Sequence, residues 1–171
     1  PLKQRYQDDP ESGKIVMAVR SITAGSEPTR CTIATTDASG KVLASWDAAA
    51  HPMAGGDGEL ACSGDLLLAS LAACQEITVR MVASAMGVEL QELEVVVEGD
   101  MDFRGTMGID PETPVGFTAI RSRVRLAADV PEDRLAKLAA RAEKYCVVGA
   151  TLRAGTALTT DISARSVSGV A

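Results

Sequence analysis

The feature that most constrains the fold is an apolar stretch at residues 66–86, LLLASLAACQEITVRMVASAM. Its length and composition predict one long helix from about Asp65 to Met86, which Gly87 would end. Apolar side chains occur on almost every side of this helix, so nearly all of its surface must be covered. A domain of 171 residues rarely covers a central helix completely. We therefore expect a second copy of the chain to cover the remainder and the protein to be a homodimer.

Composition and charge exclude several other classes of protein. Gln75, Glu76 and Arg80 interrupt the apolar stretch, so we expect no membrane span. The N-terminal sequence PLKQRYQDDPESGK is polar and lacks the apolar segment of a signal peptide, which favours a cytoplasmic location. The formal net charge of −6 disfavours binding to nucleic acid or to anionic lipid.

Strand patterns occur on both sides of the long helix and indicate an α+β protein. We expect residues 1–13 to be a mobile lead-in and residues 14–171 to form a single domain. Outside the long helix, the patterns predict strands at 14–23, 29–36, 41–46, 89–103, 117–128 and 157–164, a loop at 47–64 and a second helix at 131–146. The strands at 89–103 and 117–128 most simply form an antiparallel hairpin with arginines on its wet face.

Two of the four cysteines lie on elements that must pack into the core. Cys74 is near the middle of the long helix, and Cys146 ends the second helix. In a reducing compartment they are not part of a disulfide framework. One interpretation is that each serves only as a small apolar core residue, because free cysteine is often buried. Each also fits a reactive thiol, but Cys74 is too far from a helix end to gain from the dipole and would need a nearby arginine.

The residues that carry these cysteines resemble a known family. The stretch LLLASLAACQEITVRMVASAMGVELQELEVVVEG resembles the central helix and following strand of the OsmC/Ohr family, the osmotically inducible and organic hydroperoxide resistance proteins. EKYCVVGATL resembles the segment that carries the second cysteine of the family, and the GG loop before the helix also fits. The resemblance runs from about Gly55 to Leu152.

This resemblance implies a fold and an activity. The fold would be an intertwined homodimer with two long central helices packed back to back and wrapped by antiparallel sheets. Cys74 would be the peroxidatic thiol, attacking an organic hydroperoxide in an apolar interface pocket and becoming a sulfenic acid. Cys146 would resolve that acid as a disulfide, which a small dithiol reduces. No cofactor and no metal is implied.

The chain departs from the family pattern at the groups that activate the thiol. The usual Pro-Glu pair before the helix cysteine is replaced by Ser63 and Gly64, and Asp65 would stand in for the carboxylate only if the helix start shifts. The family takes its thiolate-stabilising arginine from the first hairpin, where Arg20 and Arg30 are the candidates. Each of these arginines also fits a solvated charge on a strand face. The proline after the second cysteine is also absent, with valine in its place.

The other thiols and the single histidine carry weaker hypotheses. Cys31 fits a core position in its strand. Cys62 fits an incidental loop residue better than an alternative resolving thiol. His51 is the only histidine, which excludes a multi-histidine metal site, and a site combining it with Cys62, Cys74 and Cys146 has no CxxC pair to support it.

Three functions remain open at this stage. The first is a thiol-dependent peroxidase with antioxidant activity against organic hydroperoxides, using the redox-active cysteines Cys74 and Cys146 under oxidative stress. The second is a binding protein of the same fold that holds an apolar small molecule at the dimer interface without turnover. The third is a purely structural dimer, which requires that neither thiol be reactive.

Overall fold

A computed structural model describes residues 2–23 and 25–164 of the chain. The chain forms two compact units. Unit 1 comprises Pro1–Leu67 and Met101–Phe117, and unit 2 comprises Leu68–Asp100 and Thr118–Ala171. The mobile lead-in at residues 1–13 and the single domain at residues 14–171 stay predictions. Residues 1, 24 and 165–171 lie outside the described part of the chain.

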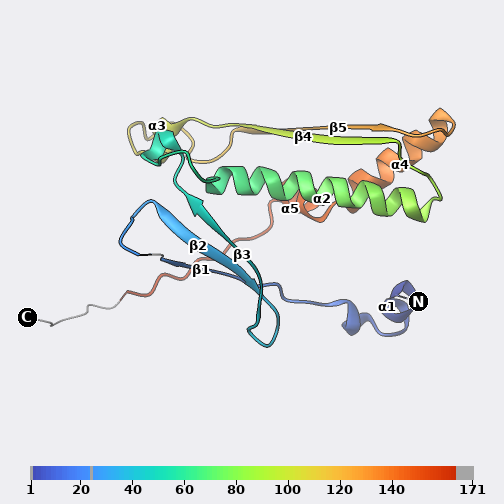
Figure 1. The fold of residues 1–171 in the computed structure, drawn as a ribbon, viewed down its shortest axis with the longest axis horizontal. Coiled ribbons are helices and arrows are strands. Elements are labelled where there is room, and N and C mark those ends of the chain that lie inside the picture. Colours follow the sequence, from blue (N-terminus) through green and yellow to red (C-terminus); the bar gives the residue numbers. More distant parts are fainter. Residues whose placement is uncertain (1, 24, 165–171) are drawn as a thin grey trace, which may run out of the picture. The chain divides into compact units, whose positions relative to one another are not determined.

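Unit 1 contains a three-stranded antiparallel sheet in the order β1-β2-β3 (Figure 1). Strand β1 is Val19–Thr23, β2 is Arg30–Thr36 and β3 is Val42–Ala49. The turn between β2 and β3 is held by Asp37, whose carboxylate accepts hydrogen bonds from the backbone N–H groups of Ser39 and Lys41 at 2.9 and 3.0 Å. The predicted three strands are therefore present, although the first begins at Val19 rather than at Lys14.

The remaining elements of unit 1 are short. They are the helices α1 (Leu2–Asp8) and α3 (Phe103–Thr106) and the 3-10 turns η1 (Pro10–Gly13) and η2 (Pro52–Ala54). The helix α1 has no buried residue. It lies within residues 1–13, the segment that the sequence predicts to be a mobile lead-in.

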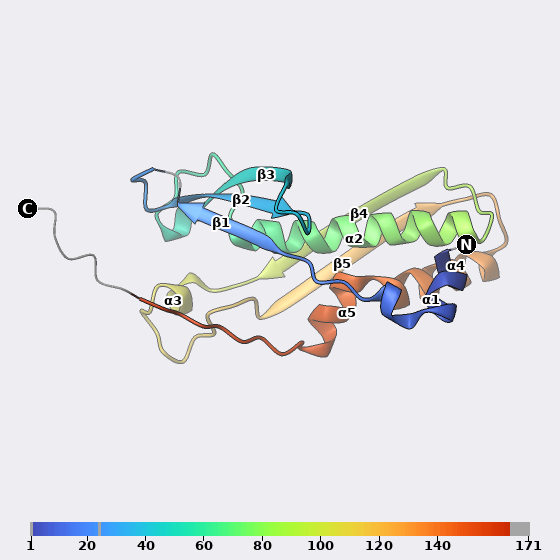
Figure 2. The same cartoon turned by 90° about the horizontal axis from the view of Figure 1, so that it is seen from below.

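Unit 2 is built around most of the long helix α2 (Ser63–Ala85) and the antiparallel hairpin of β4 (Glu92–Asp100) and β5 (Ala119–Ala127). The hairpin runs alongside α2 (Figures 1 and 2). One face of the hairpin carries cross-strand ion pairs, which join Arg121 to Asp100, Arg123 to Glu98 and Arg125 to Glu94. This pairing confirms the predicted hairpin and its wet face.

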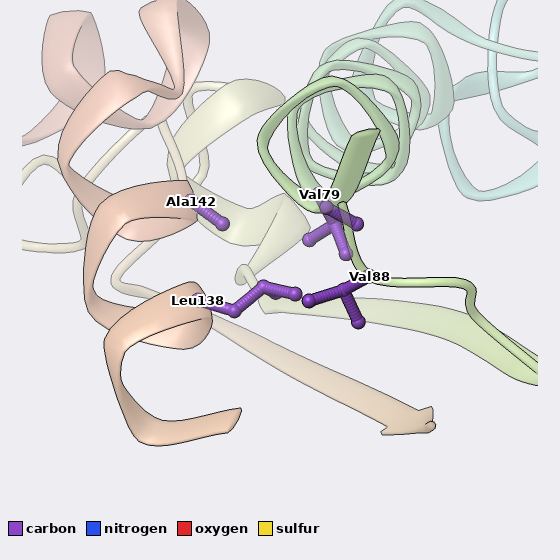
Figure 3. Packing of buried hydrophobic residues seen from close by; sticks show 5 residues of the cluster. Val79, Val88, Leu138 and Ala142 are labelled. Atoms are coloured by element: carbon purple, nitrogen blue, oxygen red, sulfur yellow. The ribbon is translucent and has the colours of Figure 1, made fainter. Parts of the chain in front are cut away.

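Two further helices follow β5, namely α4 (Glu132–Tyr145) and α5 (Val147–Ala154). The core of unit 2 lies where the end of α2 meets α4. Val79, Val88, Leu138 and Ala142 point toward one another there (Figure 3). Leu138 is fully buried, whereas Tyr145, from the same predicted apolar stripe, is 59% exposed.

The helix α5 is absent from the sequence-based expectation because its sequence, VVGATLRA, has two β-branched residues and a glycine in its first turn. Its ends explain why it forms. Cys146 caps its start, and Gly155 ends it in the left-handed conformation at φ 59°.

The predicted strand at 157–164 is wrong. The described residues after Gly155 have no regular structure, and Leu158 and Ile162 are 89% and 86% exposed. A strand needs a hydrogen-bonded neighbour, and no described strand of this chain pairs with the segment.

The predicted long helix is confirmed, because α2 spans Ser63–Ala85 and Gly87 follows at φ 61°. By length and composition α2 is, among the described residues, the one helix that could cross a membrane. Core helices of soluble proteins have the same composition. The expectation of no membrane span therefore rests on the polar residues of α2 and stays a prediction.

Candidate functional site: a hydrogen-bonded pair of thiols in unit 2

The two cysteines singled out from the sequence lie side by side in unit 2. The thiol of Cys146 donates a hydrogen bond to the sulfur of Cys74, with the two sulfur atoms 3.4 Å apart. Both are free thiols. Cys146 is 1% exposed and Cys74 is partly buried. A disulfide needs a shorter sulfur–sulfur distance, so oxidation would require only a small approach of the two side chains.

Cys146 is held at the junction of two helices. It is both the C-cap residue of α4 and the N-cap residue of α5, and its backbone is extended, with φ −72° and ψ 107°. Its sulfur accepts a hydrogen bond from the backbone N–H of Gly149 at 3.3 Å. Side-chain oxygens of serine or aspartate usually make this capping contact, and here a sulfur takes their place. The bend between α4 and α5 thus fixes the position of the second thiol.

Cys74 is partly buried and lies at the edge of the buried face of α2. Leu71 and Val79, on the neighbouring turns, are 5% and 3% exposed. The hydroxyl of Thr78 donates to the carbonyl oxygen of Cys74 at 2.6 Å. The amide oxygen of Gln75 accepts a hydrogen bond from Ser122 on β5. The bond between Ser122 and Gln75 joins the middle of α2 to β5, next to Cys74.

The surroundings of the two sulfurs favour different protonation states. Burial alone raises the pKa of the Cys74 thiol, but four donors outweigh it. The backbone N–H of Val148, the Cys146 thiol, the Thr78 hydroxyl and the N–H of Val147 bring this pKa below its ordinary value. Burial and the neighbouring Cys74 sulfur raise the pKa of Cys146 against the lowering effect of Gly149 N–H. Of the two thiols, Cys74 is therefore the one that ionises first, and Cys146 is the one that keeps its proton longer.

The donors at Cys74 come from an element that the sequence did not reveal. The first turn of α5 presents free backbone N–H groups, which stabilise negative charge. At Cys74 these are the N–H groups of Val147 and Val148, whose hydrogen bonds lower its pKa. The one signal for α5 in the sequence is Gly155, a residue typical of helix ends. The segment between Cys146 and Gly155 is long enough for a short helix.

One arginine near the pair was also missed. Arg153, in the last turn of α5, lowers the pKa of Cys146 by its charge. Its guanidinium donates to the backbone carbonyl of Glu143 at 3.2 Å. Gly149 lies between the Cys146 sulfur and the Arg153 guanidinium. A Cβ atom at this position would be 3.3 Å from the sulfur and 3.5 Å from an Arg153 nitrogen, so the absence of a side chain keeps this space open. A single arginine seven residues after Cys146 is no signal until α5 is known to exist.

The residues predicted to stabilise the thiolate lie in unit 1, in other settings. Arg30 on β2 forms ion pairs with Asp57 and, at 2.6 Å, with Glu59, and these hydrogen bonds raise its pKa. Arg20 is exposed on β1, opposite Ala34. A role for Arg20 or Arg30 at the thiolate stays a prediction.

Asp65 has a local structural contact at the start of α2. Its carboxylate accepts a hydrogen bond from the backbone N–H of Cys62 at 2.9 Å, which is the main reason that its pKa is lowered. The carboxylates that hold Arg30 are instead Asp57 and Glu59, from the loop before α2. Their signal in the sequence is the acidic character of GGDGEL, within the segment predicted only as a loop.

The other cysteines and the histidine have local contacts. The sulfur of Cys62 accepts a hydrogen bond from the N–H of Asp65 at 3.5 Å. Cys31 lies in β2 opposite Ala48 and is partly buried. His51 caps η2 through the N–H of Met53 and stacks on Phe103. Within residues 2–23 and 25–164, no group of three or more His, Cys, Asp or Glu side chains is arranged to hold a metal ion.

The fold and the thiol pair together define an α+β protein with two adjacent cysteines, whose pKa values are shifted in opposite directions, between a long helix and a short one. The family model described as OsmC-like protein matches residues 56–161. The chain therefore belongs to the OsmC-like family, and the resemblance inferred from the sequence is confirmed. No curated protein sequence gives a significant match.

Solved structures show the same fold. An OsmC-like protein from Mycoplasma pneumoniae is 17% identical, with a TM-score of 0.64 over 82% of this chain and 89% of that one. An organic hydroperoxide resistance protein OsmC from Legionella pneumophila is 20% identical, with a TM-score of 0.57 over 81% and 90%. A putative organic hydroperoxide resistance protein from Vibrio cholerae, with captopril in one of its active sites, is 18% identical, with a TM-score of 0.51 over 82% and 87%.

Proposed function

We propose that this protein is a thiol-dependent peroxidase that reduces organic hydroperoxides through a Cys74–Cys146 couple. The observation that carries the proposal is the hydrogen bond of 3.4 Å in which the Cys146 thiol donates to the Cys74 sulfur. It stabilises Cys74 as the thiolate, which is the form that attacks a peroxide. It also places the second thiol so close that only a small movement of the two side chains would bring the sulfurs to bonding distance.

The chemistry proceeds in three steps. The Cys74 thiolate attacks the nearer peroxide oxygen, the O–O bond breaks, and Cys74 becomes a sulfenic acid while an alcohol is released. The Cys146 sulfur then attacks the sulfenic sulfur, forming the Cys74–Cys146 disulfide with loss of water. A small dithiol reduces this disulfide by thiol–disulfide exchange and returns both thiols.

The substrate class follows from the surroundings of Cys74 and from the relatives. Cys74 lies on an apolar helix and its own unit places no charged side chain in hydrogen-bond contact with its sulfur among the described residues. Such a site favours a peroxide with an apolar organic group over hydrogen peroxide. The names of the Legionella and Vibrio proteins support the same class.

We propose that the working form is a cytoplasmic homodimer in which α2 packs against α2 of the second copy. Three side chains at helical spacing, Ala73, Ile77 and Met81, form an exposed stripe, and Ile77 and Met81 are 53% and 67% exposed. Exposed apolar stripes of this kind mark protein–protein contacts. Ile15, Val16 and Met17 are each more than 80% exposed. They add apolar surface that a second copy of the chain would cover.

The test is consumption of cumene hydroperoxide with dihydrolipoamide, a small dithiol, as the reductant. The wild type should turn over, Cys74→Ser should be inactive, and Cys146→Ser should release one equivalent of alcohol and stop. Cys31→Ser is the matched control and should turn over like the wild type. Absence of turnover by fully reduced wild-type protein would contradict the peroxidase. Saturable binding of the peroxide without consumption would instead support the binding protein considered in the sequence analysis.

A further inference from the structure

The peroxidase chemistry leaves one proton unassigned. When the Cys74 thiolate breaks the O–O bond of an alkyl hydroperoxide, the departing oxygen leaves as an alkoxide, which is a strong base. In a site shielded from water, a positioned acid is needed to protonate it. The donor must lie within hydrogen-bond reach of the reacting atoms at Cys74.

Cys146 is the acid that the structure places there. Its thiol already points its proton at the Cys74 sulfur, over 3.4 Å. It is 1% exposed, so its proton cannot be supplied or removed readily by bulk water. The N–H of Gly149 donates to its sulfur at 3.3 Å and would stabilise the thiolate that remains after proton transfer.

The other donors around Cys74 are unsuited to the task. Thr78 carries an alcohol, which is no stronger as an acid than the alcohol that is being formed. The N–H groups of Val147 and Val148 are backbone amides and do not release protons. Guanidinium groups do not serve as acids in proteins, and Arg153 affects the pair through its charge on Cys146.

We propose that the Cys146 thiol is the general acid of the first step and delivers its proton to the departing alkoxide oxygen. Cys74 gains a bond to the nearer oxygen, the O–O bond breaks, the S–H bond of Cys146 breaks, and the alcohol leaves neutral. Cys146 remains as a thiolate, which attacks the sulfenic sulfur; the S–O bond breaks and hydroxide leaves, taking a proton from solvent. The inference rests on the proposed peroxidase function and adds a second task to the resolving cysteine.

The charges around Cys146 agree with this sequence of steps. Burial and the negative Cys74 sulfur keep the proton on Cys146 in the reduced protein by raising its pKa. Oxidation of Cys74 to the neutral sulfenic acid removes the second of these effects. Gly149 N–H and the charge of Arg153, both of which lower the pKa of Cys146, then favour the thiolate that resolution requires.

The test compares two peroxides whose leaving groups differ in basicity. Cumene hydroperoxide releases an alkoxide and needs an acid, whereas peroxybenzoic acid releases benzoate, a weak base that needs none. First-turnover product formation is measured by quenched flow for wild type, Cys146→Ala and Cys146→Ser, at a pH where the peroxy acid is neutral. Any change in the nucleophilicity of Cys74, or partial misfolding, affects both peroxides alike, so the ratio of the two rates isolates the acid.

The expected result is a loss of roughly 10²-fold with cumene hydroperoxide in Cys146→Ala, at the lower end of general-acid effects, with little loss on peroxybenzoic acid. Cys146→Ser should be slow as well, because a hydroxyl donates a hydrogen bond but is a poor acid. An unchanged ratio in Cys146→Ala, or full speed in Cys146→Ser, would overturn the inference and leave Cys146 as a resolving thiol only. Failure of the wild type to react at Cys74 would instead overturn the proposed function.

Discussion

The sulfur of Cys146 lies 3.4 Å from the sulfur of Cys74 and donates a hydrogen bond to it. The two residues are far apart in the chain and come from different helices of unit 2. Their hydrogen bond couples the two thiols, and their surroundings lower the pKa of Cys74 and raise that of Cys146.

The order in which the two thiols ionise is the first prediction. The donors around Cys74 lower its pKa, while burial and the Cys74 sulfur raise that of Cys146. Only the thiolate reacts with iodoacetamide. As the pH rises, Cys74 should therefore be alkylated below the usual range of a free cysteine and Cys146 above it, as measured by peptide mass spectrometry after timed labelling.

A matched variant checks the cause of that order. Cys146→Ala removes the thiol donor, so the alkylation midpoint of Cys74 should move to higher pH. Cys31→Ala, which removes a distant thiol, should leave it unchanged. Equal alkylation profiles for Cys74 and Cys146 in the wild type would argue against an ionised member of the pair.

Gly149 should matter because a side chain there would be in tight contact with the Cys146 sulfur. A Cβ atom at this position would lie 3.3 Å from the Cys146 sulfur and 3.5 Å from the Arg153 guanidinium. Gly149→Ala should move one or both of them and slow formation of the Cys74–Cys146 disulfide after a pulse of cumene hydroperoxide. Gly116→Ala, at a glycine with nothing within 4 Å of its Cβ position, is the control. Equal disulfide rates in the two variants would show that this close approach has no effect.

The position of α4 against α2 depends on Leu138. Its side chain is 0% exposed and packs with Val79 and Val88 (Figure 3). Leu138→Ala should lower the free energy of unfolding by about 2–5 kcal/mol, the usual range for a buried leucine. Lys137→Ala on the exposed face should change it by less than about 0.5 kcal/mol. Urea unfolding followed by circular dichroism measures both, and a small effect for Leu138→Ala would contradict the described core.

The exposed stripe of α2 predicts the oligomeric state. With a chain mass of 17.8 kDa, the wild type should have about twice this mass by light scattering. The double substitution Ile77→Glu and Met81→Glu places charge in the proposed contact and should halve the measured mass. The control Lys137→Glu, on α4, should remain dimeric. A monomeric wild type would refute the proposed contact between two copies of α2.

The sequence allowed accurate prediction of elements whose residues alternate or repeat regularly. The hairpin of β4 and β5 and the helices α2 and α4 followed from apolar periodicity, Gly87 and the acidic start of α4. Both cysteines of the pair could be named because they lie on these elements. Their separation could not be predicted, because it depends on the bend at Cys146 between α4 and α5.

The missed parts of the site share one physical cause. The residues of α5 have weak intrinsic helix preference, and its formation depends on the caps at Cys146 and Gly155. Without α5, neither the amides of Val147 and Val148 nor Arg153 could be assigned to the thiols. The predicted strand at 157–164 failed for a related reason, since strand formation is decided by a pairing partner rather than by local pattern.

The central claim is that Cys74 and Cys146 together reduce an organic hydroperoxide, and the most direct measurement follows both products of one turnover. Fully reduced protein is mixed with one equivalent of cumene hydroperoxide, and the alcohol and the disulfide are quantified by chromatography and peptide mapping. The account predicts one molecule of cumyl alcohol and one Cys74–Cys146 disulfide per chain. Recovery of the peroxide intact with all four thiols still free would contradict it.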